Sequence, residues 1–307
     1  MSESQSTHQV LMIRPVRFAG NTATAASNHF QQLSGDHADA QSQALAEFNE
    51  LVRRLRAASV LVHEVADTLE PHTPDAIFPN NWVSFHDDGT VVLYPMLALN
   101  RRLERRMDVL QCLSEQGLRI RQTIDLTTHE ADEKFLEGTG SLVLDRVNRI
   151  AYACISPRTD LDVLGDFAQR LDYELVTFDA ADAGVPIYHT NVLMCVGTRF
   201  AVLCSEVIAA HERAAVLHAL RSSGHEVIEI SAVQMRAFAG NMLELRTEQG
   251  ELCVAMSQSA FDALTAVQRQ KLNELAGTLV VSAIPTIERL GGGSVRCMLA
   301  EVFLPRR

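Results

Sequence analysis

Paired runs of apolar residues, each pair joined by a short polar turn, recur along the chain. In every pair an apolar run is followed by charged residues, asparagine or glycine and then by a second apolar run, which predicts a β-hairpin. A further apolar run starts at Ser294 and continues to Leu304, with no second strand after it in the sequence. The complete hairpins are expected at 81–95, 141–155, 191–204 and 241–256.

The hairpins begin at positions 81, 141, 191, 241 and 294, so successive starts lie 60, 50, 50 and 53 residues apart. A period near 50 residues indicates a repeat fold. Between hairpins the pattern predicts one amphipathic helix and one further strand; in the first helix Ala44, Phe48 and Leu51 recur at helical spacing. The expected helices are 40–57, 100–116, 159–171, 205–222 and 258–276, and the expected strands are 60–65, 118–126, 173–178, 226–230 and 278–284.

The unit of helix, strand and hairpin predicts that the repeats close into a ring. Five units bury their apolar helix faces in this way, and the apolar segment 10–13 could supply the hairpin strand that is missing after Ser294. We therefore expect one α/β domain over residues 1–307. Each hairpin starts with a short polar residue, so these starts should face one central space: Asn81, Ser141, Asn191, Asn241 and Ser294.

Composition narrows the class of protein. The chain has 307 residues, of which 47% are hydrophobic and 21% charged, as in ordinary globular proteins. Its formal net charge of −11 disfavours binding to nucleic acid or an anionic membrane surface. No apolar run approaches the roughly 20 residues that cross a bilayer, and the polar segment 1–8 lacks the apolar region of a signal peptide, so we expect a cytoplasmic protein. The six cysteines have no C-x-x-C spacing, which argues against a zinc site or a disulfide framework.

Three reactive residue types lie near the repeat starts. Cys297 follows the run Gly291–Gly293, and such a run is kept where the backbone must bend or approach a ligand closely. His189 and Glu137 lie near the starts of two other units. Taken singly, they are explained as a buried thiol, a hydrogen-bonded histidine and a solvated turn residue. Their coincidence at equivalent positions favours thiol catalysis, with a carboxylate that orients the imidazole or holds the substrate.

These motifs resemble those of the pentein or amidinotransferase superfamily of guanidine-modifying enzymes. Its members share a Glu-Gly-Gly-Asp turn, a His-x-Asp segment and a C-terminal glycine-rich loop that ends in the nucleophilic cysteine. Here these look like Glu137-Gly138-Thr139-Gly140, His189-Thr190-Asn191 and the segment 291–297. The resemblance covers nearly the whole chain and implies a five-bladed, pseudo-symmetric α/β propeller.

The resemblance also implies substrate-binding residues. Phe78-Pro79-Asn80-Asn81 looks like a Phe-x-x-Asp segment whose acid grips the guanidinium. By similarity to the dimethylarginine dimethylaminohydrolase branch, Arg158 and either Arg101 or Arg102 would pair with the substrate α-carboxylate, a role that suits the bidentate guanidinium.

Two departures from the family pattern bear on the substrate. Asn81 and Asn191 stand where two aspartates usually hold a cationic guanidinium. The loss of one charged partner from a buried ion pair costs about 3–5 kcal/mol, so a guanidinium would be poorly held. A neutral ureido group presents an oxygen to which an asparagine can donate. The amides therefore favour citrulline or a relative, and the superfamily contains a citrulline-hydrolysing branch with a similar Phe-Pro-x-Asn-Trp segment.

The expected reaction starts with attack of the Cys297 thiolate on the ureido carbon. His189 would protonate the departing nitrogen and then activate water, while Glu137 positions the ureido nitrogens, giving ornithine, ammonia and carbon dioxide. No metal or organic cofactor is implied, and the partner is a small amino-acid substrate.

The alternatives are an arginine deiminase-like, dimethylarginine dimethylaminohydrolase-like or amidinotransferase enzyme, and a non-catalytic propeller scaffold. A homo-oligomer is possible, and the segment up to Gln32 is either an active-site lid or merely mobile.

Overall fold

The computed structural model describes residues 4–34 and 39–306, and in this part of the chain most strands belong to three-stranded sheets. Each such sheet consists of an antiparallel pair extended by a parallel strand, as the repeat predicts. The strands are β1 (Gln9–Arg14), β2 (Leu61–Ala66) and β17 (Ala300–Glu301); β3 (Val83–Phe85), β4 (Thr90–Leu93) and β5 (Gln122–Asp125); β6 (Val143–Asp145), β7 (Ile150–Cys154) and β8 (Glu174–Phe178); β11 (Met194–Val196), β12 (Phe200–Leu203) and β13 (Glu226–Glu229); β14 (Leu243–Arg246), β15 (Leu252–Ser257) and β16 (Thr278–Ser282). The short strands β9 (Ala181–Asp182) and β10 (Val185–Pro186) form a separate hairpin.

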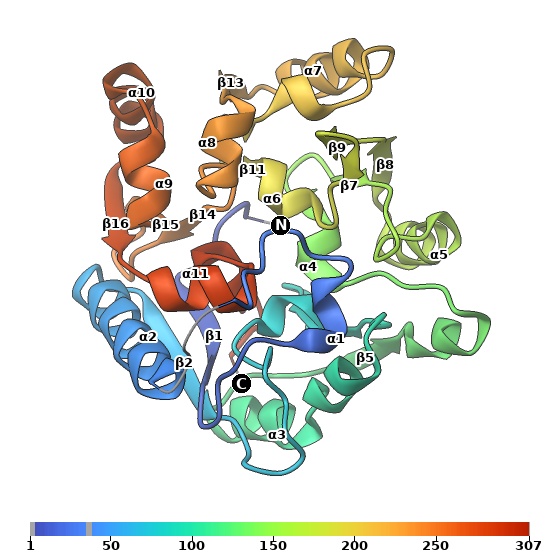
Figure 1. The fold of residues 1–307 in the computed structure, drawn as a ribbon, viewed down its shortest axis with the longest axis vertical. Helices are drawn as coiled ribbons and strands as arrows, with labels where there is room; N and C mark the ends of the chain where they lie inside the picture. The colour runs from blue at the N-terminus through green and yellow to red at the C-terminus, as the bar shows by residue number, and fades with distance from the viewer. Residues whose placement is uncertain (1–3, 35–38, 307) are drawn as a thin grey trace.

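The longer helices lie around the outside of the molecule (Figure 1). They are α2 (Ala40–Ala57), α3 (Met107–Glu115), α5 (Leu161–Leu171), α7 (Arg213–Ser222) and α10 (Ala266–Ala276). Helix α2 has the predicted bounds, and Ala44, Phe48 and Leu51 on its apolar stripe are fully buried. The shorter helices are α1 (Thr22–Ala25), α8 (Ala232–Arg236), α9 (Gln258–Ala263), α11 (Pro285–Gly291) and the 3-10 turns η2 (Leu99–Glu104), η3 (Thr127–Asp132) and η4 (Ser205–Val207).

Three predicted helices were too long, because each is divided into two shorter helical segments. The segment 258–276 contains α9 and α10, and Thr265 caps α10 with a capping box that it forms with Gln268. The segments 100–116 and 205–222 each begin with a 3-10 turn, η2 or η4, and continue as helices α3 and α7 only after a break. Apolar periodicity alone does not reveal such breaks.

The strand that the C-terminal run lacks comes from the N-terminus, as predicted. Strand β1 pairs antiparallel with β17, where Val10 lies opposite Glu301, and parallel with β2, where Val10 lies opposite Val62. The two ends of the chain thus share one sheet. No sheet of the described residues closes on itself, so the closed five-bladed propeller stays a prediction.

Four of the five repeat starts lie in or directly before helical turns, whereas we predicted the first residues of strands; Asn241 follows a turn and lies in neither a helix nor a strand. The turns are η1 (Pro79–Asn81), α4 (Gly138–Ser141), α6 (Thr190–Leu193) and η5 (Val295–Met298), and each precedes a strand of its unit. Turn α4 packs against η1 and α6, and η1 packs against η5. A helical turn spreads consecutive side chains around its axis, whereas a strand alternates them between two faces. Several neighbouring residues can therefore reach the space where these turns meet.

No helix among the described residues is long and apolar enough to cross a membrane.

Candidate active site

A cavity with about 250 Å³ of empty volume lies where the turns meet. Cys297 on η5 lines it and is 3% exposed. The glycines before it are required by close packing: a Cβ on Gly291 would lie 2.6 Å from the Phe78 ring, and Gly292 adopts φ +62. A larger residue at either place would displace the loop that positions the thiol. The cavity is lined by Asn28, Asp75, Phe78, Asn81, Arg101, Arg158, Tyr188, His189, Gly291, Gly292, Gly293 and Cys297.

Two amide side chains flank the Cys297 sulfur. Nδ2 of Asn191 lies 3.5 Å and Nδ2 of Asn241 lies 3.3 Å from Sγ. The second amide is itself held, because Asn241 Nδ2 also donates to the Asn191 carbonyl at 2.8 Å. Both residues are buried. Two N–H donors aimed at one sulfur stabilise its anionic form, which is the nucleophile.

His189 and Glu137 form a buried pair. His189 Nε2 donates to Glu137 Oε2 at 2.8 Å, and burial, opposed by Glu137, lowers the pKa of His189 to about 4. The imidazole is therefore neutral near pH 7, and because the carboxylate can only accept, the proton is on Nε2. Nδ1 carries the free lone pair, which makes it the atom that can take up a proton.

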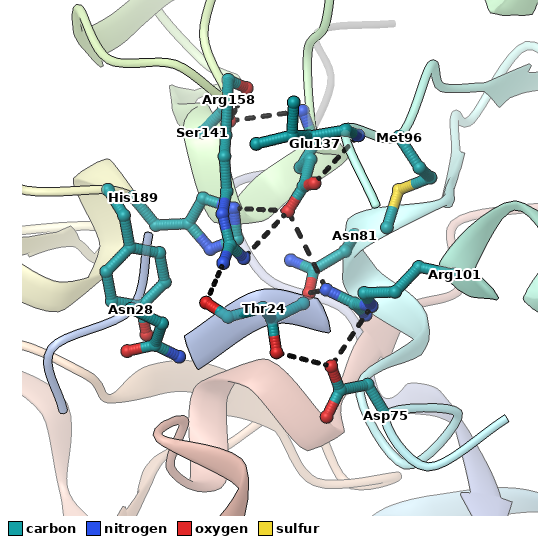
Figure 2. Close-up of polar contacts among 12 residues, drawn as sticks. Thr24, Asn28, Asp75, Asn81, Met96, Arg101, Glu137, Ser141, Arg158 and His189 are labelled. Carbon is teal, nitrogen blue, oxygen red and sulfur yellow. Dashed lines mark hydrogen bonds and ion pairs between the residues drawn. The ribbon is translucent and has the colours of Figure 1, made fainter. Parts of the chain in front are cut away.

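Glu137 is held in its ionised form by cations. Burial by itself would raise its pKa, but Arg158, the hydrogen bond from His189 and Arg101 together lower it. Arg158 Nη1 lies 3.2 Å and Arg101 Nη1 3.6 Å from Oε2 (Figure 2). The other oxygen, Oε1, accepts from the Leu97 backbone N–H at 3.2 Å. With these contacts in place, Glu137 orients the imidazole, the first of the two roles considered for the carboxylate.

Arg101 determines which way the Asn81 amide faces. Its Nη1 donates to Asn81 Oδ1 at 3.0 Å, while Glu104 accepts from Nε and Nη2, both at 2.9 Å. A guanidinium can only donate, so the amide oxygen must face it. Among the described residues Asn81 Nδ2 has no hydrogen-bond partner, which leaves it as a free donor.

Gly140 leaves room for this donor and for the imidazole. A Cβ at this position would lie 2.4 Å from Asn81 Nδ2 and 2.7 Å from His189 Nδ1. The family turn that Glu137 to Gly140 resembles carries an aspartate here. Glycine therefore lets the Asn81 donor and the free imidazole nitrogen approach the same point.

The segment 21–32, which we call the strap, is fastened along the cavity. Asn28 Nδ2 donates to the carbonyls of Gly291 at 3.4 Å and Gly292 at 3.2 Å. Arg158 Nη2 donates to Ser27 Oγ at 2.7 Å and to the Thr24 carbonyl at 3.3 Å. These bonds link the strap to the glycine loop that precedes Cys297 and to Arg158 on the cavity wall. The strap therefore contributes to the wall of the cavity through Asn28.

Asp75 is a cavity residue that the sequence did not reveal. Its Oδ2 accepts from Asn21 Nδ2 of the strap at 2.7 Å, and Arg101 Nε lies 3.6 Å from the same oxygen. Oδ1 is buried and has no hydrogen-bond partner in the part of the chain that the structure describes. A free carboxylate oxygen on the wall of a cavity can accept from a substrate ammonium group.

The predicted site residues fall into two groups. The structure brings Cys297, His189, Glu137, Asn81, Asn191, Arg158 and Arg101 together, as the predicted central space requires. Of the neighbouring pair between which the sequence left the choice open, Arg101 lines the cavity and Arg102 does not: Arg102 Nε donates to the Met96 carbonyl at 3.0 Å, and its guanidinium lies over the Phe135 ring. Asn191 contacts the cysteine sulfur, not the cavity wall. Asn241 was singled out as a repeat start but not as a site residue.

Burial distinguishes four of the other cysteines from a reactive thiol. It raises the pKa of Cys154, Cys195 and Cys204 to about 12 and that of Cys253 to about 11. These four are therefore protonated and unreactive near pH 7.

Comparison with known proteins identifies the family. Residues 14–304 match the family described as N,N dimethylarginine dimethylhydrolase, eukaryotic. The chain belongs to this family. This match confirms the predicted membership of the pentein superfamily. It also confirms that the family consists of hydrolases acting on carbon–nitrogen bonds other than peptide bonds, as predicted. No curated protein matches the chain by sequence at the threshold applied.

Solved structures resemble this family member in fold. The arginine dihydrolase ArgZ of the ornithine–ammonia cycle in cyanobacteria is 19% identical with a TM-score of 0.76, over 97% of this chain and 41% of ArgZ. Its isolated N-terminal domain, bound to substrate, is 18% identical with a TM-score of 0.74, over 96% of this chain and 99% of the domain. The dimethylarginine hydrolase DDAH of Pseudomonas aeruginosa, in complex with citrulline, is 13% identical with a TM-score of 0.65, over 98% and 100% of the two chains. The mixed α/β fold is thus shared, and this chain spans about two fifths of the full ArgZ length.

Proposed function

We propose that this protein hydrolyses the ureido group of citrulline or a closely related amino acid to give ornithine, ammonia and carbon dioxide. The observation that carries the proposal is the orientation of Asn81. Its oxygen is occupied by Arg101 at 3.0 Å, and its NH₂ group is a free donor beside His189. A ureido oxygen accepts from such a donor, whereas a guanidinium presents only N–H groups and would meet it donor to donor.

The first chemical step uses the neutral imidazole. His189 Nδ1 takes the thiol proton of Cys297, and the resulting thiolate, held by Asn191 and Asn241, forms a bond from Sγ to the ureido carbon. The developing charge is on the ureido oxygen, where Asn81 Nδ2 donates. As the carbon–nitrogen bond breaks, His189 returns its proton to the leaving nitrogen, and a carbamoyl thioester remains on Cys297.

The second step regenerates the thiol. His189 removes a proton from water, the hydroxide attacks the thioester carbon, and the Sγ–C bond breaks with return of the proton to sulfur. The product is a carbamate, which decomposes to carbon dioxide and an amine. Glu137 accepts from Nε2 in both steps and stabilises the imidazolium that forms each time.

The amino-acid end of the substrate is held by opposite charges. Arg158 lines the cavity with its guanidinium 4.9 Å from the centre of the Tyr188 ring, and its Nη2 donates to Ser27 and Thr24 of the strap. An α-carboxylate would bind Arg158 by taking the place of these two strap acceptors. Asp75 Oδ1 accepts from the α-ammonium group. A cation and an anion that line the same cavity favour a zwitterionic substrate over agmatine, which lacks the carboxylate.

The second candidate is hydrolysis of a guanidino substrate such as arginine or dimethylarginine. The family description and the likeness to ArgZ favour it. The two candidates differ in what Asn81 must contact, since a guanidinium needs an acceptor there.

Side-by-side assays of citrulline, arginine, agmatine and dimethylarginine, with ornithine and ammonia as readouts, separate the candidates. We expect ornithine from citrulline, and no activity after Cys297→Ser. Conversion of arginine to citrulline with citrulline inert would refute the ureido proposal. Inertness toward all four substrates would favour the non-catalytic scaffold.

We also infer that the three-stranded sheets are the blades of one pseudo-symmetric propeller and that the chain is a single domain. The shared sheet of β1, β2 and β17, which joins the two ends of the chain, supports this inference.

A further inference from the structure

A second hollow lies outside the strap. It has about 810 Å³ of empty volume, compared with about 250 Å³ for the cavity at Cys297. Its lining residues come mainly from the strap, from α8 and from α11, and both helices are labelled in Figure 1. The lining residues that matter here are Phe30, Asp182, Arg236, Phe238, Glu288 and Arg289.

Arg289 is the free cation of this hollow. It is half-buried on α11, and among the residues that the structure describes its guanidinium has no hydrogen-bond or ion-pair partner. Arg236 differs, because its Nε and Nη2 donate to the two oxygens of Asp182 at 2.7 and 2.5 Å. A partly desolvated guanidinium with no partner gains most from a carboxylate, with which it forms two parallel hydrogen bonds.

The balance of charge indicates what kind of carboxylate fits. The two arginines are balanced by Asp182 and Glu288, and burial lowers the pKa of His29, the remaining titratable residue of the lining, which keeps it neutral near pH 7. A site of no net charge repels neither end of a zwitterion, whereas a phosphate dianion would meet two carboxylates. The rings of Phe30 and Phe238, 5.4 Å apart, provide an apolar wall for an aliphatic chain.

The hollow adjoins the active-site cavity through a thin wall. Asn28, which contacts Gly292, is followed in the chain by His29 and Phe30 of the hollow. The Phe30 ring meets the Tyr188 ring edge-on at 6.0 Å, and Tyr188 donates to the Gly292 carbonyl at 2.5 Å. Glu288 of the hollow accepts from Ser294 Oγ at 2.6 Å, three residues before Cys297.

We propose that this hollow is an outer binding site for a zwitterionic amino acid. Arg289 pairs with the α-carboxylate, Asp182 accepts from the ammonium group, and the side chain lies along Phe30 and Phe238. The bound molecule is next to the Asn28 and Tyr188 contacts that separate it from Cys297. The choice of citrulline as its occupant rests on the proposed function, but the existence of the site does not.

Calorimetric titration of citrulline into the Cys297→Ser protein tests the site without turnover. We expect two binding events per chain. Arg289→Glu in the same background should weaken one event by about tenfold or more, because it places like charges together, and should leave the other unchanged. Arg221→Glu, on the outer helix α7, makes the same change of charge away from the hollow and should retain both events. A single event in all three proteins, or two unchanged events after Arg289→Glu, would overturn the proposal.

The kinetics of the otherwise unaltered enzyme provide an independent readout. Arg289→Glu should reduce kcat/KM by about fivefold at low salt while kcat stays unchanged, with a smaller reduction in high salt. A fall in kcat with unaltered binding would mean that the substitution disturbs Glu288 and the cysteine loop, and would also count against the site. If the wild-type protein turns over arginine and not citrulline, the proposed function fails, and the same titrations with arginine still decide whether the outer site exists.

Discussion

Replacement of Asn81 by aspartate should reverse the substrate preference. The two side chains have nearly the same shape, and Arg101 Nη1, 3.0 Å from Asn81 Oδ1, would donate equally well to a carboxylate oxygen. The change is therefore concentrated at the other atom, where the free Nδ2 donor becomes an acceptor. Arg101 and Arg158 nearby balance the added negative charge, so the variant should still fold.

The magnitude follows from the two contacts that change. For citrulline, a donor is lost and the ureido oxygen faces a carboxylate, which costs about 1–3 kcal/mol, or roughly 5- to 150-fold in kcat/KM. For arginine, the cation gains the charged partner whose absence from a buried pair costs about 3–5 kcal/mol, roughly 150-fold or more. The ratio of the two kcat/KM values should therefore shift toward arginine by about a thousandfold or more.

The assay is the initial rate of product formation from each substrate in wild-type, Asn81→Asp and Asn81→Ala proteins. The alanine variant is the matched control, because it removes the donor without adding an acceptor. It should lose citrulline turnover and gain nothing toward arginine. If Asn81→Asp keeps the wild-type ratio, the Asn81 amide does not select the substrate, and the argument from its orientation is wrong.

Three further predictions concern the groups around the thiol. Gly140→Ala should lower kcat by about a hundredfold, because the added methyl group displaces Asn81 and His189. The control is Gly165→Ala on α5, where no atom lies within 4 Å of the new Cβ, and it should leave kcat unchanged. Both variants should have the circular dichroism spectrum of the wild type. Asn241→Ala should lower kcat by about tenfold or more with little change in KM, because it removes a donor to the Cys297 sulfur. Asn241→Asp should slow alkylation of Cys297 by iodoacetamide at neutral pH, since a carboxylate would repel the thiolate. Burial lowers the pKa of His189 from 6.5 to about 4, so between these pH values the unfolded chain binds a proton at His189 that the folded chain does not. The neutral histidine therefore contributes about 3 kcal/mol to the free energy of unfolding above pH 6.5, and this contribution is lost as the pH falls toward 4. Urea unfolding from pH 7 to 4 should show a shallower loss in His189→Gln than in the wild type, and parallel curves would contradict the assignment.

The repeat pattern could be predicted from the sequence because it depends on local periodicity. Helix α2 has the predicted bounds, and the pairing of β1 with β17 follows from counting one strand too few at the C-terminus. The repeat starts were mistaken for strands because Asn81 and Asn191 precede apolar runs that suit either structure. Their helical turns are stabilised by contacts among α4, α6 and η1 from different repeats, which no local window contains.

Within the site, residue types could be predicted and directions could not. Cys297, His189 and Glu137 were found because three reactive types occupy equivalent positions in the repeat. The choice between Arg101 and Arg102 required the 3-10 turn η2, which brings Arg101 to Glu104 and the cavity and directs Arg102 toward Met96. Asp75 was missed because its carboxylate is positioned in part by a hydrogen bond from Asn21 of the strap, and Asn21 is 54 positions away in the sequence.

The same limit applies to the strongest sequence argument, the two asparagines. A sequence shows that an amide replaces a carboxylate, but an amide can present either a donor or an acceptor, and only the donor selects a ureido oxygen. Glu104 holds Arg101, Arg101 takes the Asn81 oxygen, and Gly140 leaves space for the NH₂ group that remains. For Asn191 the outcome differs, because its NH₂ group is directed to the Cys297 sulfur and the Thr139 carbonyl. We therefore expect one asparagine to act on the nucleophile and the other on the substrate, so substitution of Asn191 should change the reactivity of the thiol more than the choice of substrate.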